Sequence, residues 1–150
     1  QEVTWGIESS RQYLGNDWTK NTEVWHRFLN EIVAIPNLKN IHFMGGEPLL
    51  NKRFPELLDF LLSIGKNNIS ISFVTNGTML NPKLIQKLKQ FSSCDIEVSL
   101  ESIHSNNEYI RQGADTKLIL QNIQKLKAAE TDTFKLVLRS VPQLLNINKT

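Results

Sequence analysis

Residues 41–50 read IHFMGGEPLL, and this stretch decides the fold class. A short β-rich run at 41–44 leads directly into two glycines, and a helical pattern begins a few residues later at Phe54. Glycine tolerates the positive φ of a tight turn, and Pro48 removes one backbone donor and stiffens the exit from the strand. The stretch therefore predicts one strand–turn–helix unit.

Three further β-rich runs cover residues 69–75, 95–100 and 134–141. Apolar side chains recur with helical spacing before and between the four runs. Their apolar faces consist of Trp25, Phe28, Leu29, Ile32 and Val33; of Phe54, Leu57, Leu58, Leu61 and Leu62; of Leu84, Ile85, Leu88 and Phe91; and of Ile119, Leu120, Ile123 and Leu126. We expect Asn81 and Asp115 to cap the last two helices, and an extra loop or helical turn around residues 105–113.

A strand–helix pair repeated three times before a last strand is typical of an α/β fold with a parallel sheet. We expect the sheet to be curved and covered outside by the helices. The side chains expected to be buried in it are Ile41, Phe43, Ile71, Phe73, Ile96, Val98, Leu136 and Leu138. We expect an irregular lead-in over residues 1–20 and the βα units over residues 21–150. Because no segment has the composition of a linker, we expect one domain.

Composition excludes several functional classes. Hydrophobic residues make up 40% and charged residues 21%, as in ordinary globular domains. The net charge is +2 without a basic block, so neither nucleic acid nor a membrane is an expected partner. Gln1 opens no signal-peptide pattern, and we expect a cytoplasmic protein. Cys94 is the single cysteine and stands before the third run, so this chain alone forms no multi-cysteine metal site.

Glycine or polar residues stand near or directly after the end of every run, at the carboxyl ends of strands where parallel α/β folds bind ligands. Gly45 and Gly46 allow the backbone to approach a bound molecule, and Glu47 can hold that turn or meet a cationic group. The alternative for these residues, and for Asn76-Gly77, is a purely structural turn. We call the segments at the carboxyl ends of the four runs the exits. Together they predict a common ligand pocket.

Two other enzyme classes are poorly supported. The chain has neither a G-x-G-x-x-G nor a G-x-x-x-x-G-K-[ST] phosphate loop, which disfavours a nucleotide-binding enzyme of another type. His26, His42 and His104 are scattered, and His42 alternates with apolar neighbours as a structural histidine does. Ser99 has no evident base partner, so hydrolase chemistry is not indicated.

Read together, the exits resemble the radical S-adenosylmethionine (radical SAM) superfamily, and within it the branch with a SPASM or twitch extension. The resemblance rests on residues 43–50 (FMGGEPLL), 73–78 (FVTNGT) and 98–101 (VSLE), and continues through 103–111 and the helix at 120–126. It implies a partial (β/α)6 barrel that binds S-adenosylmethionine and a [4Fe-4S] cluster. It also implies that S-adenosylmethionine is cleaved reductively to a 5′-deoxyadenosyl radical, which abstracts hydrogen from the substrate. The partners that it implies are an electron donor and a peptide or protein substrate.

The resemblance assigns cosubstrate contacts to residues at the first and third exits. The backbone of Gly45, Gly46 and Glu47 would meet the methionyl amino group. Ser99 and Glu101 would face the ribose or the carboxylate. These residues form the first part of the predicted binding site.

Four further residues complete that site. Thr75 and Asn76 lie at the matching second exit, and Arg111 and Arg139 are the candidates to pair with the ligand carboxylate. The alternatives are a loop salt bridge for Arg111 and a surface position at a strand end for Arg139. Both alternatives stay open at this point.

The family's cluster hangs on a C-x-x-x-C-x-x-C loop after the first barrel strand, and this sequence has no such motif. Either the chain is an excerpt that starts after that loop, or the protein is a degenerate relative, a non-catalytic α/β binding module without a cluster. Gln1 and the presence of only the later strands favour the excerpt. The iron ligands are then expected upstream of Gln1, and this chain alone is expected to be inactive, with no metal ligand or catalytic residue of its own.

Overall fold

A computed structural model describes residues 17–104, 106–144 and 146–147. The contact pattern divides the chain into two compact units, one up to Asn37 and one from Leu38 onward. The expectation of a single domain stays a prediction. Most of the predicted irregular lead-in, residues 1–16, lies outside the described residues.

In the first unit, the 3-10 helix η1 (Trp18–Lys20) precedes helix α2 (Thr22–Ala34), so the last residues of the predicted lead-in are helical. The Asn21 side chain accepts hydrogen bonds from two backbone amides of the first turn of α2 and caps it. Trp18, Trp25 and Phe28 form an aromatic cluster with ring centroids 5.2–6.1 Å apart. The periodicity that predicted α2 is confirmed, although Val33 is exposed.

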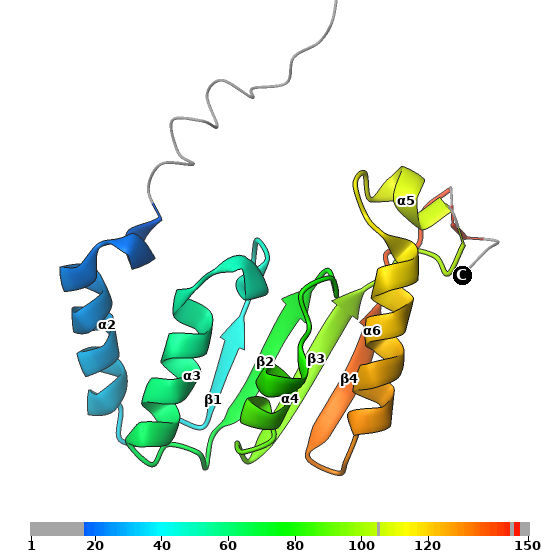
Figure 1. Ribbon diagram of the computed structural model, residues 1–150. Coiled ribbons are helices and arrows are strands. Elements are labelled where there is room, and N and C mark those ends of the chain that lie inside the picture. Colours follow the sequence, from blue (N-terminus) through cyan, green and yellow to red (C-terminus); the bar gives the residue numbers. More distant parts are fainter. Residues whose placement is uncertain (1–16, 105, 145, 148–150) are drawn as a thin grey trace, which may run out of the picture. The chain divides into compact units, whose positions relative to one another are not determined.

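The second unit contains a four-stranded sheet formed by β1 (Asn40–Phe43), β2 (Ser70–Thr75), β3 (Ser93–Ser99) and β4 (Phe134–Arg139). The strand order is β1-β2-β3-β4, and every neighbouring pair is parallel (Figure 1). In the register, Phe43 lies opposite Phe73, and Phe73 lies opposite Ile96. The predicted α/β parallel sheet is confirmed.

Helices connect the strands in the expected order. They are η2 (Pro48–Leu50), α3 (Arg53–Ser63), α4 (Pro82–Leu88), α5 (Asn106–Ile110) and α6 (Thr116–Ala129). The predicted caps are confirmed, because Asn81 accepts a bond from Leu84 N and Asp115 one from Leu118 N, each 2.9 Å long. Helix α5 is the extra helical turn expected near residue 105. None of the helices in the described ranges combines the length and the apolar character that crossing a bilayer requires.

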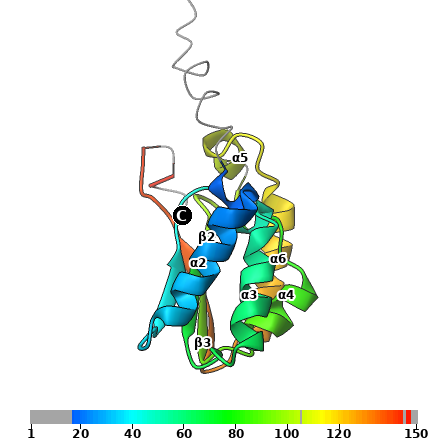
Figure 2. The same cartoon turned by 90° about the vertical axis from the view of Figure 1, so that its left-hand side faces the viewer.

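Helices α3, α4 and α6 lie on one face of the sheet (Figure 2). Side chains that alternate along the strands point into this layer, and Ile71, Phe73, Ile96 and Val98 are fully buried there. The residues between them point to the other side, which we call the open face: His42, Ser72, Val74, Asp95, Glu97, Ser99, Val137 and Arg139. The core therefore sits between the sheet and one layer of helices.

Burial was predicted wrongly on the outer strands. Leu138 is 54% exposed, and Ile41, Phe43 and Leu136 are only half-buried. All four lie on β1 or β4, each of which pairs with only one other strand among the described residues. A side chain on an edge strand has packing neighbours on one side only, so part of its surface stays accessible.

Cys94 also departs from the expectation. It lies inside β3 rather than before it, because β3 starts at Ser93 and Cys94 pairs in register with Ile71 and Phe134. Its side chain faces the helices and is buried.

We predict that Gly77→Ala destabilises the second unit more than Gly65→Ala. Both glycines have positive φ, +77° and +71°, so each substitution places an L residue in the left-handed region, at a cost of about 1–2 kcal/mol. A Cβ at Gly77 would also lie 2.9 Å from Val98 Cγ1, whereas one at Gly65 meets no atom within 4 Å. Urea unfolding of both variants measures the difference, and equal losses would show that the Gly77 turn yields without strain.

Candidate functional site

The carboxyl ends of all four strands meet at one edge of the sheet, where the arrowheads lie in Figure 1. Parallel pairing places the segments that follow β1, β2 and β3, and the end of β4, at this edge. Eight of the nine predicted site residues lie at or directly after these ends, and Arg111 reaches the same edge from the segment after α5. The common edge expected from the sequence is therefore present.

The Gly45-Gly46 turn presents bare backbone. The two φ angles are +84° and +58°, and a Cβ built on either glycine meets no atom within 4 Å. The amide and carbonyl groups of both glycines make no hydrogen bond to another residue in the described part of the chain. The turn can therefore offer backbone donors and acceptors to a bound molecule. In a tight structural turn these groups would form hydrogen bonds within the turn itself.

Glu47 holds the turn in place. Its Oε1 accepts hydrogen bonds from Thr75 Oγ1 (2.8 Å) and Leu49 N (3.2 Å), and its Oε2 accepts one from Asn76 N (2.6 Å). The carboxylate thus joins the segment after β1 to the end of β2. Of the two roles that the sequence left open for this side chain, holding the turn is the one observed.

Thr75 and Asn76 are engaged within the second exit. Thr75 Oγ1 accepts a bond from Gly77 N (3.1 Å), and Asn76 Oδ1 accepts bonds from Thr78 N (2.9 Å) and Thr78 Oγ1 (2.7 Å). Helix α6 supports this turn, because Asn122 Nδ2 donates to the carbonyl of Gly77 (2.8 Å). The second exit is therefore held in place by hydrogen bonds within the protein.

Ser99 ends β3 on the open face and is 8% exposed. Its hydroxyl makes no hydrogen bond to another residue that the structure describes. The hydroxyl can therefore both donate to and accept from a ligand.

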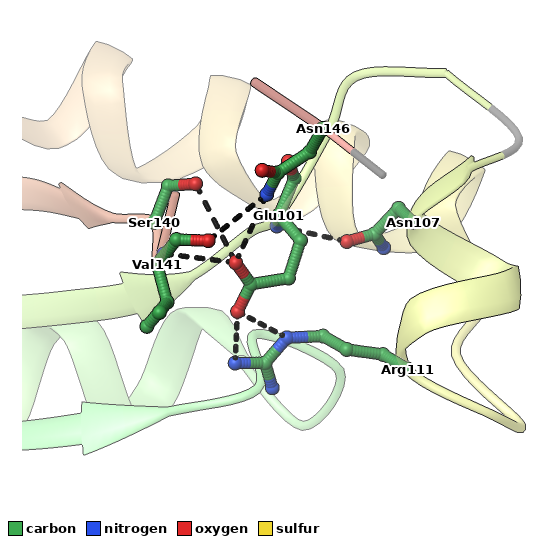
Figure 3. A network of polar contacts seen from close by, with 6 residues as sticks. All are labelled: Glu101, Asn107, Arg111, Ser140, Val141 and Asn146. Atoms are coloured by element: carbon green, nitrogen blue, oxygen red, sulfur yellow. Dashed lines mark hydrogen bonds and ion pairs between the residues drawn. The ribbon is translucent and has the colours of Figure 1, made fainter. Parts of the chain in front are cut away.

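The structure separates the two arginines. Arg111 pairs with Glu101, with Nη2 2.9 Å and Nε 3.2 Å from Oε1 (Figure 3). Arg139 pairs with Glu97 through an Nη2–Oε2 distance of 2.7 Å. The salt bridge that was the alternative for Arg111 is thus observed, and so is the alternative for Arg139, whose side chain is 53% exposed at the end of β4 and pairs with Glu97.

Several residues of the edge escaped the sequence analysis. Asn107, Asn122 and Asn146 are buried polar side chains that hold its loops, and Glu97 binds Arg139. Asn122 could have been found, because it lies three residues after Ile119 and four before Leu126, on the buried face of α6. Asn107 and Asn146 lie in segments without periodicity, so no comparable signal marks them.

The described residues contain no group of three or more His, Cys, Asp or Glu side chains that could hold a metal ion. Burial, and secondly the charge of Asp95, raises the pKa of the Cys94 thiol to about 12. The thiol therefore stays protonated at neutral pH, which disfavours a role as metal ligand or nucleophile.

The surface also has a hollow of about 440 Å³ beside α5 and α6, lined among others by Ile103, Glu108, Lys117 and Gln124. None of the nine predicted site residues lines it. The exits instead border the open face, which within the second unit is one side of a four-stranded sheet rather than an enclosed cavity.

Comparison with known proteins points to the same family as the sequence motifs at the strand ends. The family model described as Radical SAM superfamily matches residues 9–141. Similar proteins include "Radical SAM cyclopropyl synthase TigE" of Paramaledivibacter caminithermalis, 31% identical over 67% of this chain, and "Probable GTP 3',8-cyclase" of Methanococcus aeolicus, 31% identical over 66%. "PqqA peptide cyclase" of Granulibacter bethesdensis is 27% identical over 57% of this chain. The aligned regions make up 22%, 33% and 22% of these three relatives.

We predict that Glu47→Gln loosens the first two exits. The amide keeps one acceptor oxygen and replaces the other with a donor, so one of the three hydrogen bonds that Glu47 accepts is lost, at a cost of about 1–3 kcal/mol. Amide hydrogen exchange should become faster at Asn76 or at Leu49, whichever of the two amides loses its acceptor oxygen. Glu56→Gln, which changes an exposed carboxylate on α3, is the control and should leave both amides unchanged; equal exchange in the two variants would contradict the role of Glu47.

Proposed function

Because the chain belongs to the radical SAM superfamily, we propose that it forms the S-adenosylmethionine-binding part of a radical SAM enzyme. In the complete protein a [4Fe-4S] cluster would supply the electron that cleaves the cosubstrate to methionine and a 5′-deoxyadenosyl radical, and this radical would abstract hydrogen from the substrate. The single observation that carries the proposal is the Gly45-Gly46 turn, whose backbone groups are unpaired among the described residues and whose Cβ positions have no atom within 4 Å.

The amino end of the cosubstrate fits this turn. Its ammonium group needs hydrogen-bond acceptors, and the carbonyls of Gly45 and Gly46 have unused lone pairs. The absence of side chains at both positions lets a ligand approach the backbone closely. Glu47 orients the turn through its bonds to the second exit and adds a negative charge near the ammonium.

Ser99 and Arg111 suit the other polar parts of the ligand. The free Ser99 hydroxyl fits a ribose hydroxyl or the carboxylate, and the Arg111 guanidinium fits the carboxylate. Thr75 and Asn76 support the site by shaping the second exit. Arg139 remains the second candidate for the carboxylate, and Glu97 is its present partner.

The cluster does not fit this chain's own residues. The sequence has one cysteine, and that thiol is buried, protonated and directed toward the helices. Cluster ligands are therefore proposed to lie outside this sequence, and no chemical step is assigned to a residue of this chain.

A peptide or protein is the proposed substrate class. One relative, the PqqA peptide cyclase, is named for a peptide, whereas another is named for GTP. A reducing partner protein is proposed as the electron donor.

We predict that Gly46→Val lowers S-adenosylmethionine affinity at least tenfold in the whole protein that contains this chain, because a branched side chain fills the space above the turn. Gly65→Val is the matched control, since Gly65 also has positive φ and open space but lies on the turn before β2, at the opposite edge of the sheet. Both variants should lose similar stability through backbone strain. Calorimetric titration beside a melting curve separates the effects, and unchanged affinity in folded Gly46→Val would mean that the turn is only structural.

We also predict that the 150-residue chain neither retains a [4Fe-4S] cluster nor forms 5′-deoxyadenosine, because one cysteine cannot supply the thiolates such clusters use. A longer protein with a C-x-x-x-C-x-x-C loop should do both after anaerobic reconstitution with iron and sulfide. The measurements are iron content and 5′-deoxyadenosine formed under a strong reductant. If the longer protein loads iron and forms no 5′-deoxyadenosine, the proposal of an enzyme is wrong and a non-catalytic binding module takes its place.

A further inference from the structure

Glu101 is the most densely bonded carboxylate of the strand-end edge (Figure 3). The residue is 4% exposed, and both of its carboxylate oxygens are occupied. Oε1 accepts two bonds from the Arg111 guanidinium, and Oε2 accepts one from Val141 N (2.9 Å) with longer contacts of 3.5 Å to Ser140 and Asn146. No acceptor site on this side chain is left turned toward open space.

Two buried asparagines fix the backbone of Glu101 from opposite sides. Asn107 Oδ1 accepts the bond from Glu101 N (3.0 Å), and Asn107 Nδ2 donates to Thr116 Oγ1 (3.1 Å). Asn146 Nδ2 donates to the carbonyl of Glu101 (3.0 Å) and to that of Val141 (3.1 Å). The position of the carboxylate is therefore set by the fold rather than by a ligand.

Arg111 has one hydrogen-bonding edge left. Its Nε and Nη2 face Glu101, while Nη1 makes no hydrogen bond to another described residue and is turned away from the carboxylate in Figure 3. The guanidinium can still bind a second carboxylate through the Nη1 and Nη2 edge, because it carries five N–H donors in a fixed plane. Its side chain is 34% exposed, so this edge can be reached from outside.

We propose that Glu101 is a positioning residue: it holds Arg111 so that the free edge of the guanidinium receives the carboxylate of the bound cosubstrate. This inference rests on the proposed function and gives Glu101 a role different from the direct ligand contact that the sequence resemblance implied. A ligand carboxylate beside Glu101 would be repelled by a buried like charge, whereas the same carboxylate beside Arg111 is attracted. The ion pair holds the arginine in place before the ligand arrives, which lowers the entropic cost of binding.

The test compares two ligands that differ only in the carboxylate. The whole protein that contains this chain is titrated calorimetrically with S-adenosylhomocysteine and with its decarboxylated amine. Glu101→Gln should weaken S-adenosylhomocysteine about tenfold and change the affinity for the amine less than twofold. Arg111→Gln should do the same, and the double variant should be no weaker than Arg111→Gln alone, since both residues act through one contact.

Two further variants keep the test decisive. Glu101→Asp retains the charge but moves it away from Arg111 by the length of one methylene group. It replaces Glu101→Gln in the test if that variant fails to fold, and it should show the same ligand selectivity. Glu97→Gln removes the carboxylate that holds Arg139. A selective loss of S-adenosylhomocysteine binding in Glu97→Gln, with none in the Glu101 variants, would overturn the proposal in favour of Arg139.

The remaining outcomes separate this inference from the proposed function. If wild-type protein binds both ligands and the Glu101 variants weaken both equally, Glu101 contacts a part that the ligands share or is merely structural, and the inference alone fails. If wild-type protein binds neither ligand, the proposed function fails and this inference falls with it.

Discussion

Parallel pairing of the four strands is the constraint from which the second unit follows. A parallel neighbour requires a crossover, and the crossovers of this sheet place α3, α4 and α6 on one face. The same geometry brings four separate chain segments, spread over about 100 residues, to one edge. Residues such as Gly46 and Ser99, which are far apart in sequence, come to the same edge of the sheet for this reason.

Two glutamates then join these segments in pairs. Glu47 connects the segment after β1 to the end of β2, and Glu101 connects the segment after β3 to the one after β4. Charged acceptors make stronger hydrogen bonds than neutral ones, and here they are directed at backbone amides as well as side chains. The walls of the edge are thus fixed by internal contacts, while the Gly45-Gly46 backbone and Ser99 stay available for a ligand.

The sequence predicts what depends on local spacing and misses what depends on the tertiary neighbours. Asp115 caps α6 as expected because capping needs only the amide of Leu118, three residues away. Leu138 fits the same apolar alternation as Ile96, yet only Ile96 lies on a strand with neighbours on both sides. The partner of Glu101 could not be read from the sequence either, because Arg111, Val141 and Asn146 reach it from three segments that only the fold brings together.

The two arginines show why similar ion pairs carry different functional weight. Arg111 and Arg139 lie 2.9 and 2.7 Å from their glutamates, so distance does not distinguish them. Their surroundings do, because the Glu101 side chain is 6% exposed and fixed by several donors, whereas Glu97 is 17% exposed and Arg139 53%. An exposed pair is screened by water and holds its side chains weakly, while a buried one cannot be broken without leaving a charge unpaired. A guanidinium fixed in this way is the better receptor for a carboxylate, because its orientation has been set during folding.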